Sequence, residues 1–268
     1  MSTTDISHPF SFLTIVSILL VLNDYCFCIN SEAFNSSLAG SFSSAVATWY
    51  GSPIGSGSGG ACGFANDVAY HPYNGLISAG NNNIFKSGKG CGTCYQVKCT
   101  QHPSCSGFPI TVTITDECPG ACNNEAFHFD LSGKAFGYLA KPGQADTLRN
   151  AGRINIMYQR VQCYHKATIT LKIDTGSNPN YLAFAVENVN GDGDLGFVEL
   201  LPSNSHQWLP MQQSWGATWK VGLPIGVHGP YTIRITTIES RQSLIANNVI
   251  PANWSPGTHY FSRVNIPT

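Results

Sequence analysis

The chain has 268 residues, with 14 Lys and Arg against 15 Asp and Glu and a formal net charge of -1. Such a balance argues against electrostatic capture of nucleic acid, and 43% hydrophobic residues argue against global disorder. No apolar run reaches the roughly 18 residues of a membrane span, and 27 Gly with 15 Pro favour turns and short strands over long helices.

An apolar segment at residues 10–22 has the length of the hydrophobic region of a secretory signal. We therefore predict a signal peptide over residues 1–30, cleaved between Asn23 and Ser31, and a secreted protein. The alternative is a buried core helix, but caps and a polar face are missing around the segment. Asn35 and Asn253 begin sequences typical of N-glycosylation, although Pro256 follows the second closely.

The chain contains 10 cysteines, of which Cys26 and Cys28 lie in the predicted cleavage region. An even set behind a secretory signal indicates four disulfides. The alternative is a redox or four-thiolate zinc site, but both need reduced thiols, which an oxidising route would not preserve. We predict no metal site and no cofactor. The remaining cysteines are Cys62, Cys91, Cys94, Cys99, Cys105, Cys118, Cys122 and Cys163.

Residues 41–165 hold all of these cysteines and are predicted to form a domain in which strands dominate. Residues 51–62, mostly Gly and Ser, indicate a flexible loop. Strands are expected at residues 95–99, 110–115 and 154–163, and the second of these alternates strictly between apolar and polar residues. Residues 131–140 are expected to form one short helix with Ala135, Phe136 and Leu139 on one face.

Residues 166–265 consist almost entirely of strand and turn patterns. Apolar residues alternate at 169–173, 182–186 and 231–235, which is typical of a small β-sandwich. Residues 190–194 resemble a calcium-binding loop, but Leu195 and Leu201 stand where such a loop requires Gly and Glu. We therefore predict a hairpin turn there.

Two acidic residues are candidates for acid–base chemistry in the first domain. Asp116 ends an alternating strand and Asp130 precedes the expected helix, and strand ends are where functional sites gather. The alternatives are an ordinary turn residue for Asp116 and a helix N-cap for Asp130. The motifs of serine hydrolases, phosphate-binding loops and zinc proteases do not occur in the sequence.

Aromatic residues are candidates for stacking on sugar rings. Trp49 and Tyr50 precede the glycine-rich loop, and core packing is the alternative for both. Trp215 and Trp219 are four residues apart, which would place them on one face if they shared a strand. Spacing does not decide which of them is exposed.

An ordered set of motifs over residues 41–265 resembles the plant expansins, in particular the β-expansin branch that includes the grass-pollen group 1 allergens. The motifs are TWYG from Thr48, GGACGF from Gly59, GCGTCY from Gly90, TDECPG from Thr115, HFDLSG from His128, SNPNYL from Ser177 and SWGATW from Ser214. The resemblance implies a mainly β protein: a six-stranded double-psi β-barrel over residues 41–165, then a carbohydrate-binding, immunoglobulin-like β-sandwich over residues 166–265.

The resemblance also implies disulfide pairs and site residues. The pairs are Cys62–Cys91, Cys94–Cys163 and Cys99–Cys105, with Cys118–Cys122 as an additional local bridge. The barrel is similar to family 45 endoglucanases, whose general acid Asp130 matches. By this likeness Thr48, Tyr50, Asp116, His128 and Asp130 line a cleft, and Trp49, Tyr181 and Trp215 extend a stacking surface across both domains.

Inverting hydrolysis needs a second carboxylate about 6.5–9.5 Å from the acid. Where those endoglucanases carry that base, this chain has Gly51, Ser52 and Pro53, and no acid follows until Asp67. An acid without its base predicts no efficient hydrolysis. The resemblance implies a secreted protein of the plant cell wall, expected as a monomer, that loosens non-covalent contacts between cellulose and glycans such as xylan without hydrolysis. It is expected to bind wall polysaccharides, and neither nucleic acid nor membrane.

Two other functions remain open at this point: a weak family 45-like endoglucanase, and a structural or defence protein that only binds the wall. The loop at residues 52–60 lacks an acidic residue that many relatives carry there. If that acid helps to hold the glycan, activity here should be weaker or differently selective.

Overall fold

The computed structural model describes residues 41–268, which belong to one compact unit. The predicted signal peptide, Cys26, Cys28 and Asn35 lie outside the described residues. No helix within residues 41–268 is long and apolar enough to cross a membrane.

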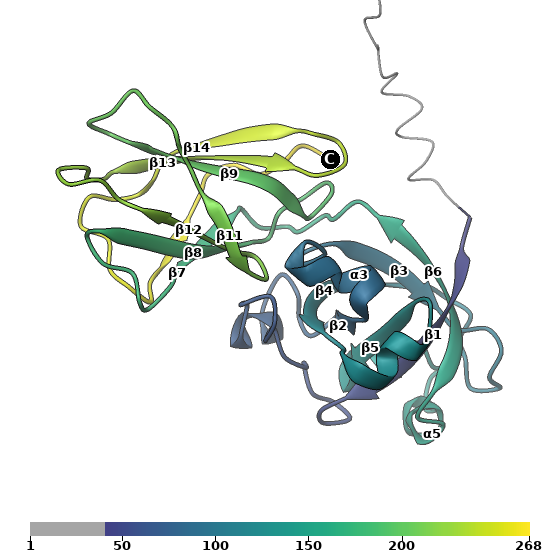
Figure 1. The fold of residues 1–268 in the computed structure, drawn as a ribbon. Helices are drawn as coiled ribbons and strands as arrows, with labels where there is room; N and C mark the ends of the chain where they lie inside the picture. The colour runs from purple at the N-terminus through teal and green to yellow at the C-terminus, as the bar shows by residue number, and fades with distance from the viewer. Residues whose placement is uncertain (1–40) are drawn as a thin grey trace, which may run out of the picture. The chain divides into compact units, whose positions relative to one another are not determined.

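Six strands close into a barrel (Figure 1). In barrel order they are β1 (Ser43–Tyr50), β5 (His128–Ser132), β2 (Ile77–Gly80), β4 (Ile110–Glu117), β3 (Cys94–Lys98) and β6 (Ile154–Val161). The pairs β1–β5 and β2–β4 are parallel, and the other neighbours are antiparallel. Alternate side chains of these strands, such as Val112 and Ile114 of β4, fill the interior. The closed barrel confirms the expected fold class.

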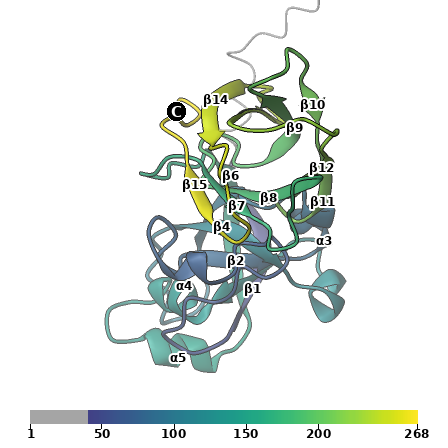
Figure 2. The same ribbon diagram turned by 90° about the vertical axis from the view of Figure 1, so that its left-hand side faces the viewer.

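Helices of the barrel domain are short. They are α3 (Asn82–Phe85), α4 (Gly133–Tyr138) and α5 (Ala145–Asn150), with 3-10 turns η1 (Asn66–Ala69), η2 (Lys86–Gly88) and η3 (Gly120–Asn124). Figure 2 shows α4 and α5 lying together, and these two helices contact each other.

The helix expected at residues 131–140 is shorter than predicted. Leu131 and Ser132 complete β5, since they pair with Trp49 and Tyr50 of β1. The Ser132 hydroxyl accepts a hydrogen bond from the Ala135 N–H and so caps α4. Asp130 is therefore not the N-cap of this helix. The predicted inner face is confirmed, because Ala135, Phe136 and Leu139 are all fully buried.

The remaining strands form two sheets that pack as a sandwich (Figure 1). One is β10 (Leu209–Pro210), β9 (Leu195–Pro202), β13 (Tyr231–Thr237) and β14 (Ser243–Ile250); the other is β11 (Gln212–Trp215), β12 (Thr218–Gly222), β8 (Tyr181–Glu187), β7 (Thr170–Ile173) and β15 (His259–Phe261). Leu182, Phe184 and Val186 of β8 point into the shared core. Ala183 and Ala185 consequently lie on the outer face of the five-stranded sheet.

The predicted hairpin turn at residues 190–194 is wrong. These residues join β8 to β9, which belong to different sheets. Gly191 instead exchanges backbone hydrogen bonds with Cys163, and Asp194 pairs with Arg160 of β6 at 2.9 Å. Alternation identifies both strands but carries no information on which sheet each one joins.

Trp215 and Trp219 do not share a strand. Trp215 ends β11, whereas Trp219 lies in β12, beyond the turn at Gly216 and Ala217. Trp219 belongs to the sandwich core and is 6% exposed, whereas Trp215 is 48% exposed. Of these two tryptophans, only Trp215 is therefore exposed enough to stack on a sugar ring.

Four disulfides are present, in the pairs that the resemblance implied: Cys62–Cys91, Cys94–Cys163, Cys99–Cys105 and Cys118–Cys122. Because these sulfurs are paired, the alternative of a four-thiolate zinc site is excluded. The pair Cys94–Cys163 spans 69 positions and Cys99–Cys105 only 6. A cross-link that closes a longer loop removes more conformational entropy from the unfolded chain.

We expect the double substitution of Cys94 and Cys163 by alanine to lower the free energy of unfolding by about 4 kcal/mol, and that of Cys99 and Cys105 by about 2 kcal/mol. Both pairs are buried, so the cavities that the substitutions leave are comparable. Guanidinium unfolding followed by tryptophan fluorescence measures the difference. Equal losses would contradict control by loop length.

Candidate functional site

The parallel pairing of β1 with β5 brings the predicted cleft residues together. Thr48 lies directly opposite Asp130, and Val46 lies opposite His128. Because side chains alternate along a strand, Thr48, Tyr50, His128 and Asp130 share the face of the barrel wall that points away from the core. Two distant segments of sequence thus supply one polar cluster.

Hydrogen bonds in this cluster converge on the Thr48 hydroxyl. Thr48 Oγ1 donates to Asp130 Oδ1 at 2.5 Å and lies 2.9 Å from His128 Nε2. A hydroxyl has one proton to donate, so His128 Nε2 is the donor to Thr48. His128 Nδ1 is then the unprotonated nitrogen, and within the described residues it has no partner.

Burial changes the protonation of all three ionisable groups in the cluster. It raises the pKa of Asp130, against the opposing effects of the Thr48 hydrogen bond and His128, while the charge of Asp116 raises that pKa further. Burial lowers the pKa of His128 and raises the pKa of Tyr50 to about 12. Asp130 therefore keeps its proton to a higher pH than an exposed aspartate does.

Asp116 and Tyr50 hold the glycine-rich loop. Asp116 Oδ1 accepts hydrogen bonds from the N–H groups of Ala61 and Glu117 at 2.8 and 2.9 Å. The Tyr50 hydroxyl accepts from Ser58 N–H at 2.9 Å and donates to the carbonyl oxygen of the same residue at 3.2 Å. These contacts give residues 58–61 a defined path, which Gly–Ser composition alone does not indicate.

Trp49 lies apart from the cluster. It belongs to the opposite face of β1, packs against the barrel core and donates from Nε1 to the Arg149 carbonyl oxygen at 3.0 Å. Its side chain is half-buried. The pairing of β1 with β5 thus brings together four of the five predicted cleft residues, and the fifth, Asp116, is connected to them through the glycine-rich loop. Trp49, predicted as a stacking residue, lies outside this cluster.

The outer face of the five-stranded sheet carries a row of directly paired residues. In strand order they are Trp215, Thr218, Ala185, Lys172 and His259. A shallow pocket of about 210 Å³ lies beside Trp215, lined by Gly63 and Ala65 of the barrel domain together with Lys172 and Thr218. An exposed indole beside a pocket that also offers the polar side chains of Lys172 and Thr218 is suited to stacking on a sugar ring.

Gly63 makes this arrangement possible. Its φ angle is +88°, and a Cβ atom there would lie 3.0 Å from Cη2 of Trp215. The Trp215 indole therefore rests on a backbone surface that only glycine provides.

Tyr181 lies on the same outer face as Trp215, opposite Gly222 at the beginning of β8. On this face of β8 only the small side chain of Ala183 lies between Tyr181 and Ala185, which belongs to the row. Sequence spacing alone missed Lys172, His259 and Gly63. Lys172 and His259 are identified by their place in the row, which depends on strand pairing, and Gly63 by its contact with the Trp215 indole.

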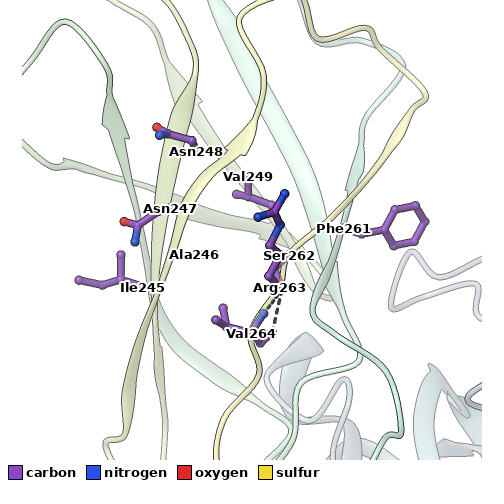
Figure 3. Close-up of a pocket in the computed structure, with 9 residues that line it drawn as sticks. All are labelled: Ile245, Ala246, Asn247, Asn248, Val249, Phe261, Ser262, Arg263 and Val264. Carbon is purple, nitrogen blue, oxygen red and sulfur yellow. Dashed lines mark hydrogen bonds between the residues drawn. The ribbon is translucent and has the colours of Figure 1, made fainter.

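Another pocket, of about 520 Å³, opens between β14 and residues 261–264 (Figure 3). Figure 3 shows Arg263 between the two chain segments and Phe261 pointing away from β14. None of the predicted site residues lines this pocket. It lies between the edge strands of the two sheets rather than beside the polar cluster.

Comparisons with known proteins agree with this architecture. The family model of the expansin C-terminal domain matches residues 169–251, and a double-psi β-barrel model described as lytic transglycolase matches residues 77–158. Expansin-B4 of Arabidopsis thaliana is 49% identical over 257 residues, which cover 95% of this chain and 97% of the relative. Expansin-B1 of Zea mays is 48% identical over 233 residues, or 84% of each chain.

Two solved structures share the fold. An expansin of Clavibacter michiganensis has a TM-score of 0.65 at 24% identity, over 85% of this chain and 100% of that chain. A variant of the Clavibacter protein in complex with cellohexaose has a TM-score of 0.64 at 23% identity, with the same coverage.

We expect Thr48→Val to raise the pKa of Asp130 further, because the hydroxyl that favours the ionised carboxylate is lost. An aspartate whose pKa is raised by folding binds more protons in the native than in the unfolded state. Its contribution to stability is therefore present at low pH and is lost as pH rises through the folded-state pKa. Because the folded-state pKa of Asp130 is higher in the variant, this loss of stability should continue to a higher pH.

The ¹³C chemical shift of the Asp130 carboxyl carbon against pH measures the first effect, and the free energy of unfolding against pH measures the second. Thr111→Val, at an exposed position of β4, is the matched control and should change neither. An unchanged Asp130 titration in Thr48→Val would show that the hydrogen bond does not control the protonation of Asp130.

Proposed function

The chain belongs to the expansin family, and we propose that it is a secreted plant cell-wall protein that loosens non-covalent contacts between wall polysaccharides without cleaving them. A polysaccharide chain would hydrogen-bond to the cluster around Asp130 and stack on Trp215. Cellulose with xylan or another matrix glycan is the substrate class that we propose.

One observation supports this function above the others: Asp130 accepts a hydrogen bond from Thr48, which His128 in turn contacts, and the carboxylates of Asp116 and Asp67 already have partners of their own. Asp116 is the carboxylate whose charge acts on Asp130, and its Oδ1 atom already accepts two backbone N–H groups. Asp67 is paired with Lys172 at 2.6 Å and His259 at 3.1 Å. A base that activates water has to be free to accept its proton.

Loosening by this site would depend on the glycan binding to the protein in place of its neighbour in the wall. The Asp130 carboxyl group would replace hydrogen bonds that the bound glycan makes to its neighbour in the wall. Stacking on Trp215 would hold the detached chain, because the C–H faces of sugar rings are apolar. The bound chain would be released intact, since no covalent bond is broken.

A weak endoglucanase is the second candidate, and the likeness of Asp130 to a general acid is the observation that favours it. Asp116 would then have to act as the base. Reducing-sugar release from cellulose and xylan, in proportion to protein and lost in both Asp130→Asn and Asp116→Asn, would establish this function. Wall binding without either creep or sugar release would instead indicate a structural or defence protein.

We expect Asp130→Asn to abolish the creep of heat-inactivated wall strips under constant load at acid pH. The amide keeps the shape of the carboxyl group but cannot supply its acidic proton. Asp146→Asn is the control, because Asp146 is an exposed carboxylate on α5 of the same domain. No creep with the unsubstituted protein, or full creep with Asp130→Asn, would overturn the proposal.

We expect Trp215→Ala to weaken binding to isolated walls by about tenfold, equivalent to about 1.4 kcal/mol, because the stacking surface is lost. Phe197→Ala is the matched control, since Phe197 is an aromatic residue 57% exposed on the four-stranded sheet. Binding isotherms on wall fragments measure both. Equal losses in the two variants would indicate adsorption through exposed apolar groups in general.

A further inference from the structure

A group of ionisable side chains lies where η1 of the barrel domain contacts the five-stranded sheet. Asp67 of η1 faces Lys172 of β7 and His259 of β15, which are paired directly across neighbouring strands. Figure 2 shows these strands side by side, with β8 next to β7. None of the contacts described for the Asp130 cluster involves this group.

Glu187, the last residue of β8, completes the group from the same outer face of the sheet. It lies opposite Thr170 of β7, two positions along from the pair of Ala185 with Lys172. The Glu187 side chain is only 3% exposed, and among the described residues its Oε1 atom has no hydrogen-bond partner. Burial raises the pKa of Glu187 to about 8, together with the charge of Asp67 and a hydrogen bond shared with it, and against the charge of Lys172.

A buried carboxyl group next to a second carboxylate is unfavourable unless a proton or a cation lies between them. Ligand atoms of Asp67, Glu187 and His259 all lie within 4.8 Å of one another. We propose that Asp67, Glu187 and His259 form a binding site for one divalent cation, Zn²⁺, which fastens the barrel domain to the sandwich.

The donor set determines the choice of metal. One imidazole nitrogen with two carboxylate oxygens suits Zn²⁺, with a solvent molecule as the fourth ligand, whereas Ca²⁺ and Mg²⁺ prefer oxygen ligands only. Zinc–ligand bonds of about 2.0–2.2 Å require the three side chains to converge slightly. Asp67 and His259 are both partly exposed, which provides a path for the ion.

Lys172 is the competing cation in this site. Its ammonium group donates to Asp67 Oδ2 at 2.6 Å and to the Phe64 carbonyl oxygen at 3.3 Å. The Phe64 carbonyl remains as a hydrogen-bond acceptor for Lys172 if the metal takes the Asp67 carboxylate. The Lys172 ammonium group repels a metal ion and occupies the Asp67 carboxylate. Removing its charge should therefore strengthen metal binding.

The other group with ligand spacing, Cys94, Cys163 and His165, does not qualify. Its two sulfurs form a disulfide and are not available as thiolates.

Isothermal titration of the secreted protein with ZnCl₂ at pH 7.5, with thermal unfolding in parallel, tests the proposal. We expect one Zn²⁺ per chain and a rise in Tm as free Zn²⁺ exceeds its Kd, because a ligand that binds only the native state stabilises it. CaCl₂ and MgCl₂ should have no effect. Co²⁺ in the same site should show the visible absorption of a four-coordinate ion.

Variants identify the site. Glu187→Gln and His259→Gln should each weaken Zn²⁺ binding at least tenfold, and Lys172→Met should strengthen it about tenfold. Glu199→Gln is the control, because Glu199 pairs with Arg234 on the four-stranded sheet and should leave binding unchanged. His259 lies at the sheet edge, so its substitution remains informative if Glu187→Gln fails to fold.

Three outcomes would overturn the proposal: no Zn²⁺-dependent change in Tm, binding that both glutamine variants retain, or binding that Lys172→Met weakens. The second would assign the ion to other histidines on the surface. The third would show that Lys172 organises the group rather than competing for it.

Discussion

The arrangement of the polar cluster and the aromatic surface depends on the segment Gly60–Gly63. Its backbone is hydrogen-bonded to the barrel domain on one side and to the sandwich on the other. Ala61 N–H donates to the Asp116 carboxylate, and Cys62 N–H donates to the Thr115 carbonyl oxygen at 3.2 Å. On the other side, the Cys62 carbonyl oxygen accepts from Ala217 N–H at 3.0 Å. The disulfide Cys62–Cys91 ties the same segment to the barrel domain.

This segment links the polar cluster to the aromatic surface. Asp116 contributes to the electrostatics of Asp130 and positions Ala61, while the turn that follows Trp215 rests on Cys62. A Cβ atom on Gly216 would lie 2.2 Å from the Ala61 carbonyl oxygen, so the turn approaches this backbone as closely as glycine allows. The Asp116 carboxylate, which acts on Asp130, and the turn that carries the Trp215 indole are thus held by the same backbone segment.

The strand predictions succeeded where side-chain character alternates along the segment, although both faces of β4 and of β8 are largely buried in the folded chain. Residues 110–115 alternate strictly and lie within β4, and the alternation at 182–186 identifies β8 with its inner and outer faces. Predictions failed where the deciding contact is remote. Leu131 and Ser132 joined a strand because β1 lies beside them, and residues 190–194 cross between sheets because Cys163 and Arg160 bind them.

The sequence by itself determined the class of fold, the number of disulfides in the barrel domain and the family, because periodicity, cysteine count and ordered motifs are local properties of the chain. Only the tertiary structure decided that Thr48 meets Asp130, that Trp215 rather than Trp219 is exposed, and that Asp67 faces Glu187. Each of these depends on which strands become neighbours and in what register. Register is set by the burial of whole faces, which no single segment of sequence contains.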